Sequence, residues 1–373
     1  MHVLIPALHR PTKPTGVCRH AANLARCLAD VDRVGHVTVI IGKWQQAYFE
    51  DLFGLDSAKV EIVTVDISNS SLSRNRWFVF GLPKLAEQIQ PDIIHLSFPF
   101  PFVRRWFSAP VVSTIHDLYP YEYPENFGYP RVWFNQLFLR QCLYQSDGLV
   151  CVSNCTLEAL KAYFPRVEKT SESTVVYNVV ESISAEPKRP SQLGHGTLSL
   201  FLMTVAQHRK NKNLDLLIQT YSQLRCAHQL PEDTWLIIVG SAGPETDNLN
   251  DLVKRLNLGN RVMFLAGLDD GELRWLYEHA ALFVIPSSTE GFCLPLVEAL
   301  IASCPVVCSD IPIFQEVGSS ACHYFSLDSQ PSQQLYKAIA SKLDSQLPTE
   351  TLTDSRFSQK EISQRLLDFY MLF

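Results

Sequence analysis

The sequence contains no long run of apolar residues. No stretch approaches the roughly eighteen apolar residues that a membrane-spanning helix needs. The N-terminal segment MHVLIPALHRPTKPTG is apolar for only a few residues before His9 and Arg10, which predicts a first buried strand and a loop rather than a secretion signal. These absences argue against an integral membrane protein and lead us to expect a cytoplasmic one.

Cysteine pairs of the metal-binding or redox type are also missing. None of the ten cysteines forms a Cys-x-x-Cys pair. Cys151 and Cys155 are four positions apart, as are Cys304 and Cys308, but each pair lies in an apolar run such as GLVCVSNC. We therefore predict that these thiols are small, reduced core residues rather than metal ligands, as is usual in the cytosol.

Basic residues are not in excess. The chain has 32 lysines and arginines against 38 aspartates and glutamates, a formal net charge of −6, which argues against a nucleic-acid partner. There are no internal repeats and no low-complexity tracts. With 373 residues, 46% of them hydrophobic, the chain is long enough for two hydrophobic cores, so two domains are expected.

Runs with strand character alternate with helical periods along almost the whole chain. Apolar runs such as HVTVIIG, GLVCVS and WLIIVGSAG alternate with amphipathic segments such as GVCRHAANLARCLADV. This alternation predicts an α/β fold of two doubly wound parallel sheets, with the ligand bound in a cleft between the domains. A polar stretch rich in Pro, Ser and Gly separates the halves. We predict domains at 1–185 and 199–352, a linker at 186–198 and a terminal amphipathic helix within 353–373.

The segment SSTEGFCLPLVEALIASCPVVCSD, residues 287–310, holds two carboxylates eight positions apart, Glu290 and Glu298. Leu294-Pro295 begins a helix directly after a strand and loop, because proline is well accommodated in the first turn. The N–H groups at this helix start form an anion site, at the edge where parallel sheets bind ligands. Carboxylates beside it suit ligand hydroxyls, so one interpretation is a nucleotide sugar. The other is that the acidic residues only complement the helix dipole.

The stretch EGFCLPLVEAL resembles the Glu-x7-Glu signature of retaining glycosyltransferases of family 4, which usually reads E-G-F-G-L-P-x-x-E-A. Other similar stretches are PTGVCRHAANLARCL, VAQHRKNKNLDLLIQTYSQL and VMFLAGLDDGELRWLYEHAALFVIPS, so the resemblance covers both halves, most densely residues 200–325. It implies the GT-B architecture, in which two Rossmann-like domains face a central cleft. The first domain would lie on the acceptor side and the second would hold the donor. The final helix would cross back to the first domain.

The resemblance also implies roles for the residues of this loop. Glu298 would bind the ribose and Glu290 the hydroxyls of the donor sugar, while Leu268, after VMFLAG, would lie near the nucleobase. The backbone of the loop would contact the sugar and the diphosphate, through Gly291, Phe292, Cys293 and Leu294. Cys293 stands where the family usually has glycine, and a side chain disfavours a positive φ. We therefore expect a narrower sugar pocket or a different loop conformation.

A basic cluster, HRKNKN at residues 208–213, follows the predicted strand LSLFLMTVA. Arginine and lysine neutralise a diphosphate and stabilise the charge that builds on a leaving group. The family usually has Gly-Arg and then a later lysine, whereas Ala206-Gln207 occupies the first position here. Arg209 and Lys212 are therefore the predicted catalytic and donor-binding residues. A solvated loop cluster is the alternative, and Lys210 is expected to be its solvated member.

The first domain carries fewer signals. In the family the turn after the first strand lies against the donor, which makes Gly16 and Val17 donor-binding candidates and His20 a candidate for the cleft. His116 precedes Asp117 at a strand end, so it is either a general base or a binding histidine held in one tautomer by its neighbour. The resemblance favours binding, near the donor sugar and the reacting bond, and the predicted catalytic set is Glu290, His116, Arg209 and Lys212.

Together, these residues and the resemblance imply a retaining transferase of the hexosyltransferase type that needs no metal and no other cofactor. Its co-substrate would be a nucleoside-diphosphate sugar. Its acceptor would be a saccharide or a lipid-linked saccharide in polysaccharide, glycolipid or glycoconjugate assembly. No Asp-x-Asp motif is apparent near the cleft elements, so Arg209, Lys212 and the helix N-terminus would stabilise the charge. Two alternatives stay open: a nucleotide-sugar epimerase on the same architecture, and a catalytically silent nucleotide-sugar-binding subunit.

Two stretches of the first domain mix arginine with aromatic residues, SRNRWFVFGLPKL at 73–85 and FPFPFVRRWF at 98–107. Three interpretations are open for them: a lipid interface, a wall of an acceptor groove, or core aromatics with arginines at the rim. If the acceptor is lipid-linked, the first interpretation places the protein peripherally on the cytoplasmic face of the membrane.

Overall fold

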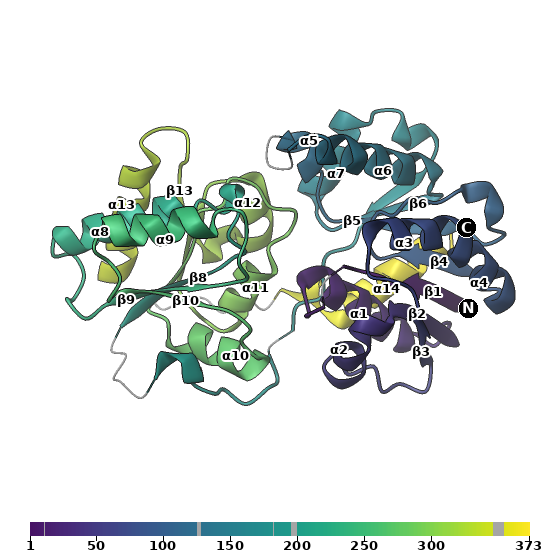
Figure 1. Cartoon of the computed structure of the whole chain (residues 1–373), viewed down its shortest axis with the longest axis horizontal. Coiled ribbons are helices and arrows are strands. Elements are labelled where there is room, and N and C mark those ends of the chain that lie inside the picture. The colour runs from purple at the N-terminus through teal and green to yellow at the C-terminus, as the bar shows by residue number, and fades with distance from the viewer. Residues whose placement is uncertain (11, 125–127, 182, 195–199, 346–353) are drawn as a thin grey trace. The chain divides into compact units, whose positions relative to one another are not determined.

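The computed structural model describes residues 1–10, 12–124, 128–181, 183–194, 200–345 and 354–373 of the chain. These residues form two compact units (Figure 1). Unit 1 comprises Met1–Val179 and Ser355–Phe373, and unit 2 comprises Val180–Asp354. Each unit contains its own parallel β-sheet and its own helices.

Unit 1 is built on a seven-stranded sheet in the order β3-β2-β1-β4-β5-β6-β7, and all its paired strands are parallel. Central strands such as HVTVIIG are apolar and buried nearly throughout, as a sheet covered on both faces requires. The strand order reverses between β1 and β4, which makes this the topological switch point of the sheet. The strands are β1 (His2–Pro6), β2 (His36–Gly42), β3 (Val60–Val65), β4 (Ile93–Leu96), β5 (Val111–Ile115), β6 (Gly148–Cys151) and β7 (Glu172–Val175).

The helices of unit 1 include one from the far end of the chain. The C-terminal helix α14 contacts α1 (Figure 1) and buries Leu366, Phe369 and Tyr370. The side chain of Gln359 also donates a hydrogen bond to Asp30 at the end of α1. The helices are α1 (Gly16–Ala29), α2 (Gln46–Asp51), α3 (Ser71–Arg76), the π-helical turn η2 (Trp77–Gly81), α4 (Leu82–Ile89), α5 (Tyr119–Glu122), α6 (Arg131–Gln145), α7 (Asn154–Tyr163) and α14 (Gln359–Tyr370), with 3-10 turns η1 (Lys43–Gln45), η3 (Arg104–Trp106), η5 (Val167–Lys169) and η9 (Ser355–Phe357).

Unit 2 is built on a six-stranded sheet in the order β10-β9-β8-β11-β12-β13, again with parallel pairs and with its switch point between β8 and β11. The strands are β8 (Phe201–Val205), β9 (Trp235–Val239), β10 (Val262–Leu265), β11 (Leu282–Ile285), β12 (Val306–Ser309) and β13 (His323–Phe325). The helices are α8 (Leu214–Cys226), α9 (Thr246–Arg255), α10 (Asp270–His279), α11 (Leu294–Ile301), α12 (Pro312–Gly318) and α13 (Pro331–Asp344), with 3-10 turns η6 (Ser191–Leu193), η7 (Lys210–Lys212) and η8 (Ser319–Ala321). The predicted fold class, two doubly wound Rossmann-like domains, is confirmed.

The polar stretch predicted as a linker at 186–198 packs on unit 2 as far as Gly194. The N–H of Lys188 donates to the carbonyl of Gly271 at 3.0 Å, and the guanidinium of Arg189 lies 5.7 Å from the ring centre of Trp275. A Cβ at Gly271 would lie 2.5 Å from the carbonyl oxygen of Glu186, so only glycine lets the two backbones approach this closely. Residues 195–198 of this linker and the predicted boundary at 352 lie outside the described residues.

In the part of the chain that the structure describes, no helix has both the length and the apolar character needed to cross a membrane.

Candidate functional site

The candidate site of unit 2 lies at its topological switch point. β8 and β11 are neighbours in the sheet, and the next strands, β9 and β12, lie on opposite sides of this pair. The loops that follow β8 and β11, residues 206–213 and 286–293, therefore begin side by side at one edge of the sheet. The predicted basic cluster lies on the first loop and Glu290 on the second.

Lys212 and Glu290 form an ion pair that joins these loops. Nζ of Lys212 lies 2.6 Å from Oε1 of Glu290, and the two side chains are only 18% and 13% exposed. The hydroxyl of Ser287 donates to the same oxygen at 2.9 Å. Because little water screens the pair, its attraction is stronger than that of a surface ion pair. The two residues predicted from separate motifs are thus brought together.

Asparagine side chains fasten the two loops to each other. Nδ2 of Asn213 donates to the carbonyl of Pro286 at 2.8 Å, and Nδ2 of Asn211 donates to the carbonyl of Thr289 at 3.2 Å. Asn213 has a φ of 47°, a left-handed conformation that asparagine adopts more readily than most residues. These bonds fix the backbone on both sides of the ion pair.

Helix α11 begins at Leu294 with Pro295 in its first turn, as predicted. Cys293 precedes it with a φ of 72°, the left-handed conformation that favours glycine. The cysteine therefore keeps the backbone shape of a glycine loop and adds a side chain to it. Burial, followed by the charge of Glu290, raises the pKa of the Cys293 thiol well above its usual value, so the thiol is neutral.

Glu298, in α11, is held by a tyrosine that the sequence analysis missed. The hydroxyl of Tyr277 donates to Oε2 of Glu298 at 2.9 Å, and the tyrosine is buried. Burial, followed by the charge of Glu298, raises the pKa of Tyr277 well above its usual value, so the hydroxyl stays a donor. Tyr277 lies on α10, and no local pattern links it to Glu298, because tertiary packing brings them together.

The other basic residues of the 208–213 cluster have different environments. Arg209 is exposed, and its Nε donates to Oε1 of Gln207 at 2.7 Å. Lys210 is exposed as predicted, with Nζ 3.8 Å from Asp215. Within the described residues, Lys212 is the member of this cluster that pairs with Glu290.

Two glycines that the sequence analysis passed over let β9 approach the basic loop. A Cβ on Gly240 would lie 1.9 Å from the carbonyl oxygen of Ala206, and one on Gly243 would lie 2.3 Å from that of His208. The turn GSAG after β9 therefore needs its glycines for close backbone approach. Leu268, the predicted contact of the nucleobase, is half-buried in the loop that follows β10.

In unit 1, His116 follows β5. Its Nε2–H donates to the carbonyl of Ser97 at 2.9 Å, which leaves Nδ1 as an acceptor. The carboxylate of Asp117 instead accepts the N–H of Tyr119 at 3.1 Å. The interpretation in which Asp117 fixes the tautomer of His116 is therefore wrong, because a backbone carbonyl fixes it.

A one-directional chain of hydrogen bonds runs through the core of unit 1. The hydroxyl of Tyr370 donates to Nδ1 of His95, and Nε2–H of His95 donates to Oγ1 of Thr114 at 2.7 Å. The Thr114 hydroxyl donates to Nε2 of His20 at 3.2 Å, and Nδ1–H of His20 donates to Oδ1 of Asn178 at 2.8 Å. Because an amide oxygen only accepts, the direction of the chain is fixed. Each histidine uses one nitrogen as donor and one as acceptor, so both are neutral.

Burial keeps the neighbouring histidines neutral as well. It lowers the pKa of His9 and that of His95 to about 3, and it lowers the pKa values of His20 and His116 from their usual range. His20, expected at the cleft, is only 6% exposed, and its ring packs edge-on against His116 with centroids 4.6 Å apart. No group of three or more His, Cys, Asp and Glu side chains converges around a metal position among the described residues.

Gly16 and Val17 form the first turn of α1, directly after the N-cap residue Thr15. Gly16 is exposed and Val17 is half-buried. They end the connection from β1, a strand at the switch point of unit 1, where open parallel sheets bind ligands.

Most aromatic residues of the two arginine-rich stretches are core residues. Arg104 pairs with Asp147 at 2.6 Å, and only Phe80, Phe98 and Trp106 are exposed large hydrophobic side chains here. The interpretation of core aromatics with arginines at the rim fits the buried members, which are Phe78, Phe100, Phe102 and Phe107.

Both units match family models. Residues 14–182 match the family described as Glycosyltransferase Family 4, and residues 186–360 match the family described as Glycosyl transferases group 1. The chain is therefore a glycosyltransferase. It combines a family 4 N-terminal domain with a group 1 C-terminal domain.

Individual relatives agree with this class. The O-antigen chain mannosyltransferase RfbU of Salmonella typhimurium is 28% identical over 320 residues, which cover 83% of this chain and 81% of RfbU. An N-acetylgalactosamine-N,N'-diacetylbacillosaminyl-diphospho-undecaprenol 4-alpha-N-acetylgalactosaminyltransferase of Campylobacter jejuni is 32% identical over 181 residues, which cover 48% of this chain and 46% of that protein.

Solved structures support the fold. Anabaena Alr3699/HepE in complex with UDP and glucose superimposes with a TM-score of 0.72 at 21% identity, covering 100% of both chains. WaaG, a glycosyltransferase involved in lipopolysaccharide biosynthesis, superimposes with a TM-score of 0.65 at 17% identity, covering 98% of this chain and 95% of WaaG. The predicted GT-B fold class is confirmed by these neighbours.

Proposed function

We propose that this glycosyltransferase moves a hexose from a nucleoside-diphosphate sugar to a hydroxyl of a saccharide or lipid-linked saccharide, in the assembly of a polysaccharide or glycoconjugate. The observation that carries the proposal is the Lys212–Glu290 pair at the switch point of unit 2. It sets one cation and one carboxylate beside the N-terminus of α11.

Each part of this arrangement matches one part of a nucleotide sugar. The ammonium of Lys212 and the N–H groups at the start of α11 suit the diphosphate. The carboxylate of Glu290 suits the sugar hydroxyls, and that of Glu298, oriented by Tyr277, suits the ribose diol. Leu268 stays the predicted contact of the base.

We propose a retaining transfer in which the sugar–diphosphate bond breaks on the same face on which the bond to the acceptor oxygen forms. The acceptor hydroxyl gives its proton to the departing diphosphate. Lys212 stabilises the charge of that leaving group, and no metal is required. Glu290 is held by Lys212 and Ser287, so we assign it to binding the sugar and not to covalent attack.

The relatives supply the expected range of substrates. RfbU is named as a mannosyltransferase, the Campylobacter relative is named for a diphospho-undecaprenol acceptor, and HepE was solved with UDP and glucose. We therefore expect a hexose or N-acetylhexosamine donor and a lipid-linked acceptor at the cytoplasmic face of the membrane. The roles of Gly16, Val17 and His116 in unit 1 stay predictions.

The test measures nucleotide release from a panel of nucleoside-diphosphate sugars, with saccharide and lipid-linked acceptors, with and without EDTA. The protein is compared with Lys212→Met, Arg209→Met and, as a matched control of equal charge, Lys210→Met. We expect EDTA-resistant release that Lys212→Met reduces by about 10²–10³-fold and that Lys210→Met leaves unchanged. The response of Arg209→Met decides whether the predicted catalytic role of Arg209 holds.

Other outcomes would contradict the proposal in distinct ways. Loss of release in EDTA, restored by Mg²⁺, would overturn the metal-free mechanism. A changed sugar without any acceptor would indicate the epimerase. Donor-dependent thermal stabilisation without release, with every acceptor tried, would indicate a silent binding subunit.

A further inference from the structure

Arg74, on helix α3 of unit 1, is a charged side chain in a buried position, only 7% exposed. Its guanidinium donates from Nη1 to the carbonyl and to Oδ1 of Asn69, and from Nη2 to Oγ of Ser71 at 3.5 Å. These acceptors are neutral, and the bonds use at most three of the five N–H groups of a guanidinium. Among the described residues, no carboxylate lies within ion-pair distance of Arg74. A buried charge normally has a counter-charge, so the burial of Arg74 leaves a positive charge without one.

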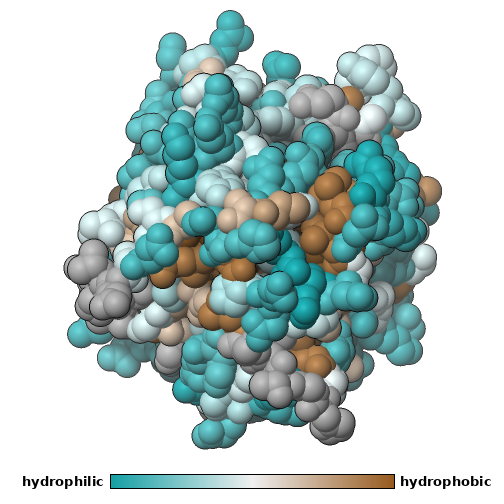
Figure 2. All heavy atoms as spheres, turned by 90° about the vertical axis from the view of Figure 1, so that its left-hand side faces the viewer, coloured by the Kyte–Doolittle hydropathy of each residue, from teal (hydrophilic) through white to brown (hydrophobic). Residues whose placement is uncertain are grey.

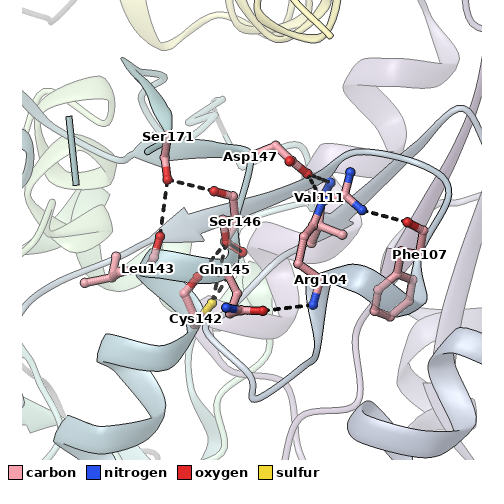
Figure 3. Close-up of polar contacts among 10 residues, drawn as sticks. Arg104, Phe107, Val111, Cys142, Leu143, Gln145, Ser146, Asp147 and Ser171 are labelled. Carbon is pink, nitrogen blue, oxygen red and sulfur yellow. Dashed lines mark hydrogen bonds and ion pairs between the residues drawn. The ribbon is translucent and has the colours of Figure 1, made fainter. Parts of the chain in front are cut away.

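Two other cations of the chain show the usual arrangements. Figure 3 shows Arg104 of unit 1, which is 31% exposed and pairs through Nε with Asp147 at 2.6 Å. Figure 2 shows the face of the molecule that carries α8 and α9 of unit 2, where hydrophilic residues dominate, and Lys254 on α9 is 76% exposed. Arg104 is thus neutralised by an acid and Lys254 is solvated by water. Arg74 has neither arrangement, because it is buried and no described acid pairs with it.

Asn69 joins Arg74 to a second arginine. Its Oδ1 accepts a hydrogen bond from Arg74, and its Nδ2 donates to the backbone carbonyl of Arg10 at 2.9 Å. Arg10 is exposed and forms no ion pair with a described residue. Burial, followed by the charge of Arg10, lowers the pKa of the Arg74 guanidinium, which stays protonated at neutral pH. The two like charges are therefore close enough to repel each other, and an anion bound beside them would relieve that repulsion.

The two arginines lie near the topological switch point of unit 1. Arg10 follows β1 and Ser97 follows β4, the two strands that meet there. Nε2 of His9, next to Arg10, shares a hydrogen bond with Oγ of Ser97 at 3.2 Å, and the carbonyl of Ser97 accepts Nε2–H of His116. Burial, followed by His116 and then Arg74, lowers the pKa of His9 to about 3, so the Arg74 guanidinium lies within electrostatic reach of this group. The arginines are therefore near the edge at which open parallel sheets bind ligands.

The chain segments around this edge carry no negative side chain. Residues 1–29, 67–86 and 93–116 contain nine arginines and lysines and no aspartate or glutamate, in a chain of net charge −6. These segments include the loop after β1, helix α3 and the connection after β4. Charge of one sign against low-dielectric walls raises the local concentration of counter-ions. The electrostatic field at this end of the sheet therefore favours an anionic ligand.

We infer that Arg10 and Arg74 bind a phosphoryl group of the acceptor. A planar guanidinium matches two phosphate oxygens at once, and two cations that no described acid neutralises suit a dianion better than a single carboxylate. The diphosphate of the donor is assigned to Lys212 and the start of α11 in unit 2, so the arginines form a second anion site. The inference rests on the proposed function in one respect, namely that the acceptor and not a free phosphate compound carries the group.

The test of the site is hydrogen–deuterium exchange of the full chain with inorganic pyrophosphate as the probe. We expect added protection in residues 67–76 of the parent protein, and equally in Lys212→Met, which removes the cation of unit 2. Arg10→Gln, at an exposed residue, should weaken the affinity for pyrophosphate about tenfold, and Arg10→Gln/Arg74→Met should abolish the protection. The matched control is Arg76→Gln, since Arg76 is exposed on the same helix and its change should leave the protection as it is. No protection in residues 67–76, or protection that survives in the double variant, would overturn the site.

Steady-state kinetics test which molecule carries the phosphoryl group. The acceptor identified in the release assay is compared as its 1-phosphate and as its methyl glycoside. The parent protein and Arg76→Gln should have a KM about tenfold lower for the 1-phosphate, and Arg10→Gln should remove that preference. Pyrophosphate protection without a preference between the two acceptors would assign the site to a free phosphate compound and overturn the assignment to the acceptor. If Lys212→Met leaves nucleotide release unchanged, the proposed function fails, while the pyrophosphate result still decides whether the arginines form an anion site.

Discussion

The two units share one type of sheet but place different polar groups where their strands end. In unit 1 these groups are His116, which follows β5, and two histidines packed near it, His20 on α1 and His95 within β4, all neutral and engaged in hydrogen bonds. In unit 2 the loops at the switch point present the charged pair Lys212–Glu290. A charged pair next to a helix N-terminus suits a charged ligand, whereas neutral histidines hold neighbouring protein groups in place through hydrogen bonds. The comparison teaches that the fold supplies the position of a site and the side chains supply its chemistry.

The two units also differ in the side chains that they expose. Among the described residues, unit 1 carries the exposed large hydrophobic side chains, and unit 2 carries the partly buried ion pair. The proposed function assigns the donor nucleotide to unit 2, whereas the polar groups in the core of unit 1 include neutral histidines. The predictions below test this division, from the largest expected effect to the smallest.

The largest effect should come from removing the negative charge of Glu290 in unit 2. Glu290→Gln keeps the shape of the side chain but removes the carboxylate that holds Lys212 in position and that we propose binds the sugar hydroxyls, so the turnover number should fall about 10²-fold or more. A double-mutant cycle with Lys212→Met should give a coupling of about 1–3 kcal/mol in thermal unfolding. The control is the exposed pair Lys254–Asp251 on α9, 3.3 Å apart, for which the coupling should stay below about 1 kcal/mol. Equal couplings would mean that the Lys212–Glu290 pair is an ordinary surface ion pair.

The next effect concerns the hydrogen-bond chain of unit 1. Thr114→Val removes one acceptor and one donor and leaves nitrogens of His95 and His20 unpaired in the core, so we expect a loss of about 2–4 kcal/mol in the free energy of unfolding. The matched control in unit 2 is Thr234→Val, because Oγ1 of Thr234 is buried without a hydrogen-bond partner among the described residues. That change should be neutral or slightly stabilising. Chemical denaturation measures the free energy of unfolding of both variants. An equal loss in both would refute the hydrogen-bond chain.

Acid should destabilise unit 1 before unit 2. The pKa values of His9 and His95 are about 3 in the folded protein against 6.5 in the unfolded chain, so below pH 6.5 the unfolded chain binds more protons. Stability is therefore full above pH 6.5 and falls as the pH drops, by about 1.4 kcal/mol per pH unit for each histidine. Calorimetry with hydrogen exchange at several pH values should show the peptides of unit 1 losing protection first. Earlier loss in unit 2 would contradict the assignment of these histidines.

Tyr277→Phe should have a smaller effect that is confined to binding. The change removes the hydrogen bond that orients Glu298, so the KM for the donor should rise about five- to tenfold while kcat changes less than about twofold. Steady-state kinetics with the identified donor measures this split. An equal fall in kcat would mean that Tyr277 acts on the reaction step, and an unchanged KM would remove Glu298 from donor binding.

The smallest effect is expected at Cys293. Cys293→Gly relieves the left-handed strain and should stabilise unit 2 by up to about 1 kcal/mol, while it widens the loop beside the predicted sugar position. Ser303→Gly, at a φ of 57° after the other end of α11, is the control for strain alone. Both variants should raise the melting temperature, but only Cys293→Gly should change the relative rates with different donor sugars. If both leave selectivity unchanged, Cys293 does not limit the sugar pocket.

Local patterns in the sequence were enough to predict the sheets and the start of α11. Continuous apolar runs such as HVTVIIG indicate strands buried on both faces, and Pro295 marks the first turn of a helix. Lys212 and Glu290 could be chosen because both follow predicted strands. Their direct pairing could not be predicted from the sequence, because it depends on β8 and β11 being neighbours in the sheet.

The features that were missed depend on tertiary contacts or on helix orientation. Tyr277 reaches Glu298 from another helix, and the hydrogen-bond chain of unit 1 draws on residues as distant as His95 and Tyr370. The stretch at 186–194 appeared to be a linker because it is polar, yet its backbone hydrogen bonds tie it to unit 2. Composition left a lipid interface, a groove wall and core aromatics open for 73–85 and 98–107, and it gave no signal for the exposed side chain of Trp133, which depends on how α6 packs on its core.

The most direct measurement of the central claim is hydrogen–deuterium exchange of the full chain with and without the nucleoside diphosphate of its donor. The account predicts that added protection concentrates in residues 206–213 and 286–298, which follow β8 and β11 of unit 2, and that Lys212→Met abolishes it while Lys210→Met does not. Protection centred elsewhere in unit 2, or protection that survives Lys212→Met at the same nucleotide concentration, would contradict the claim that the switch point of unit 2 is the donor site.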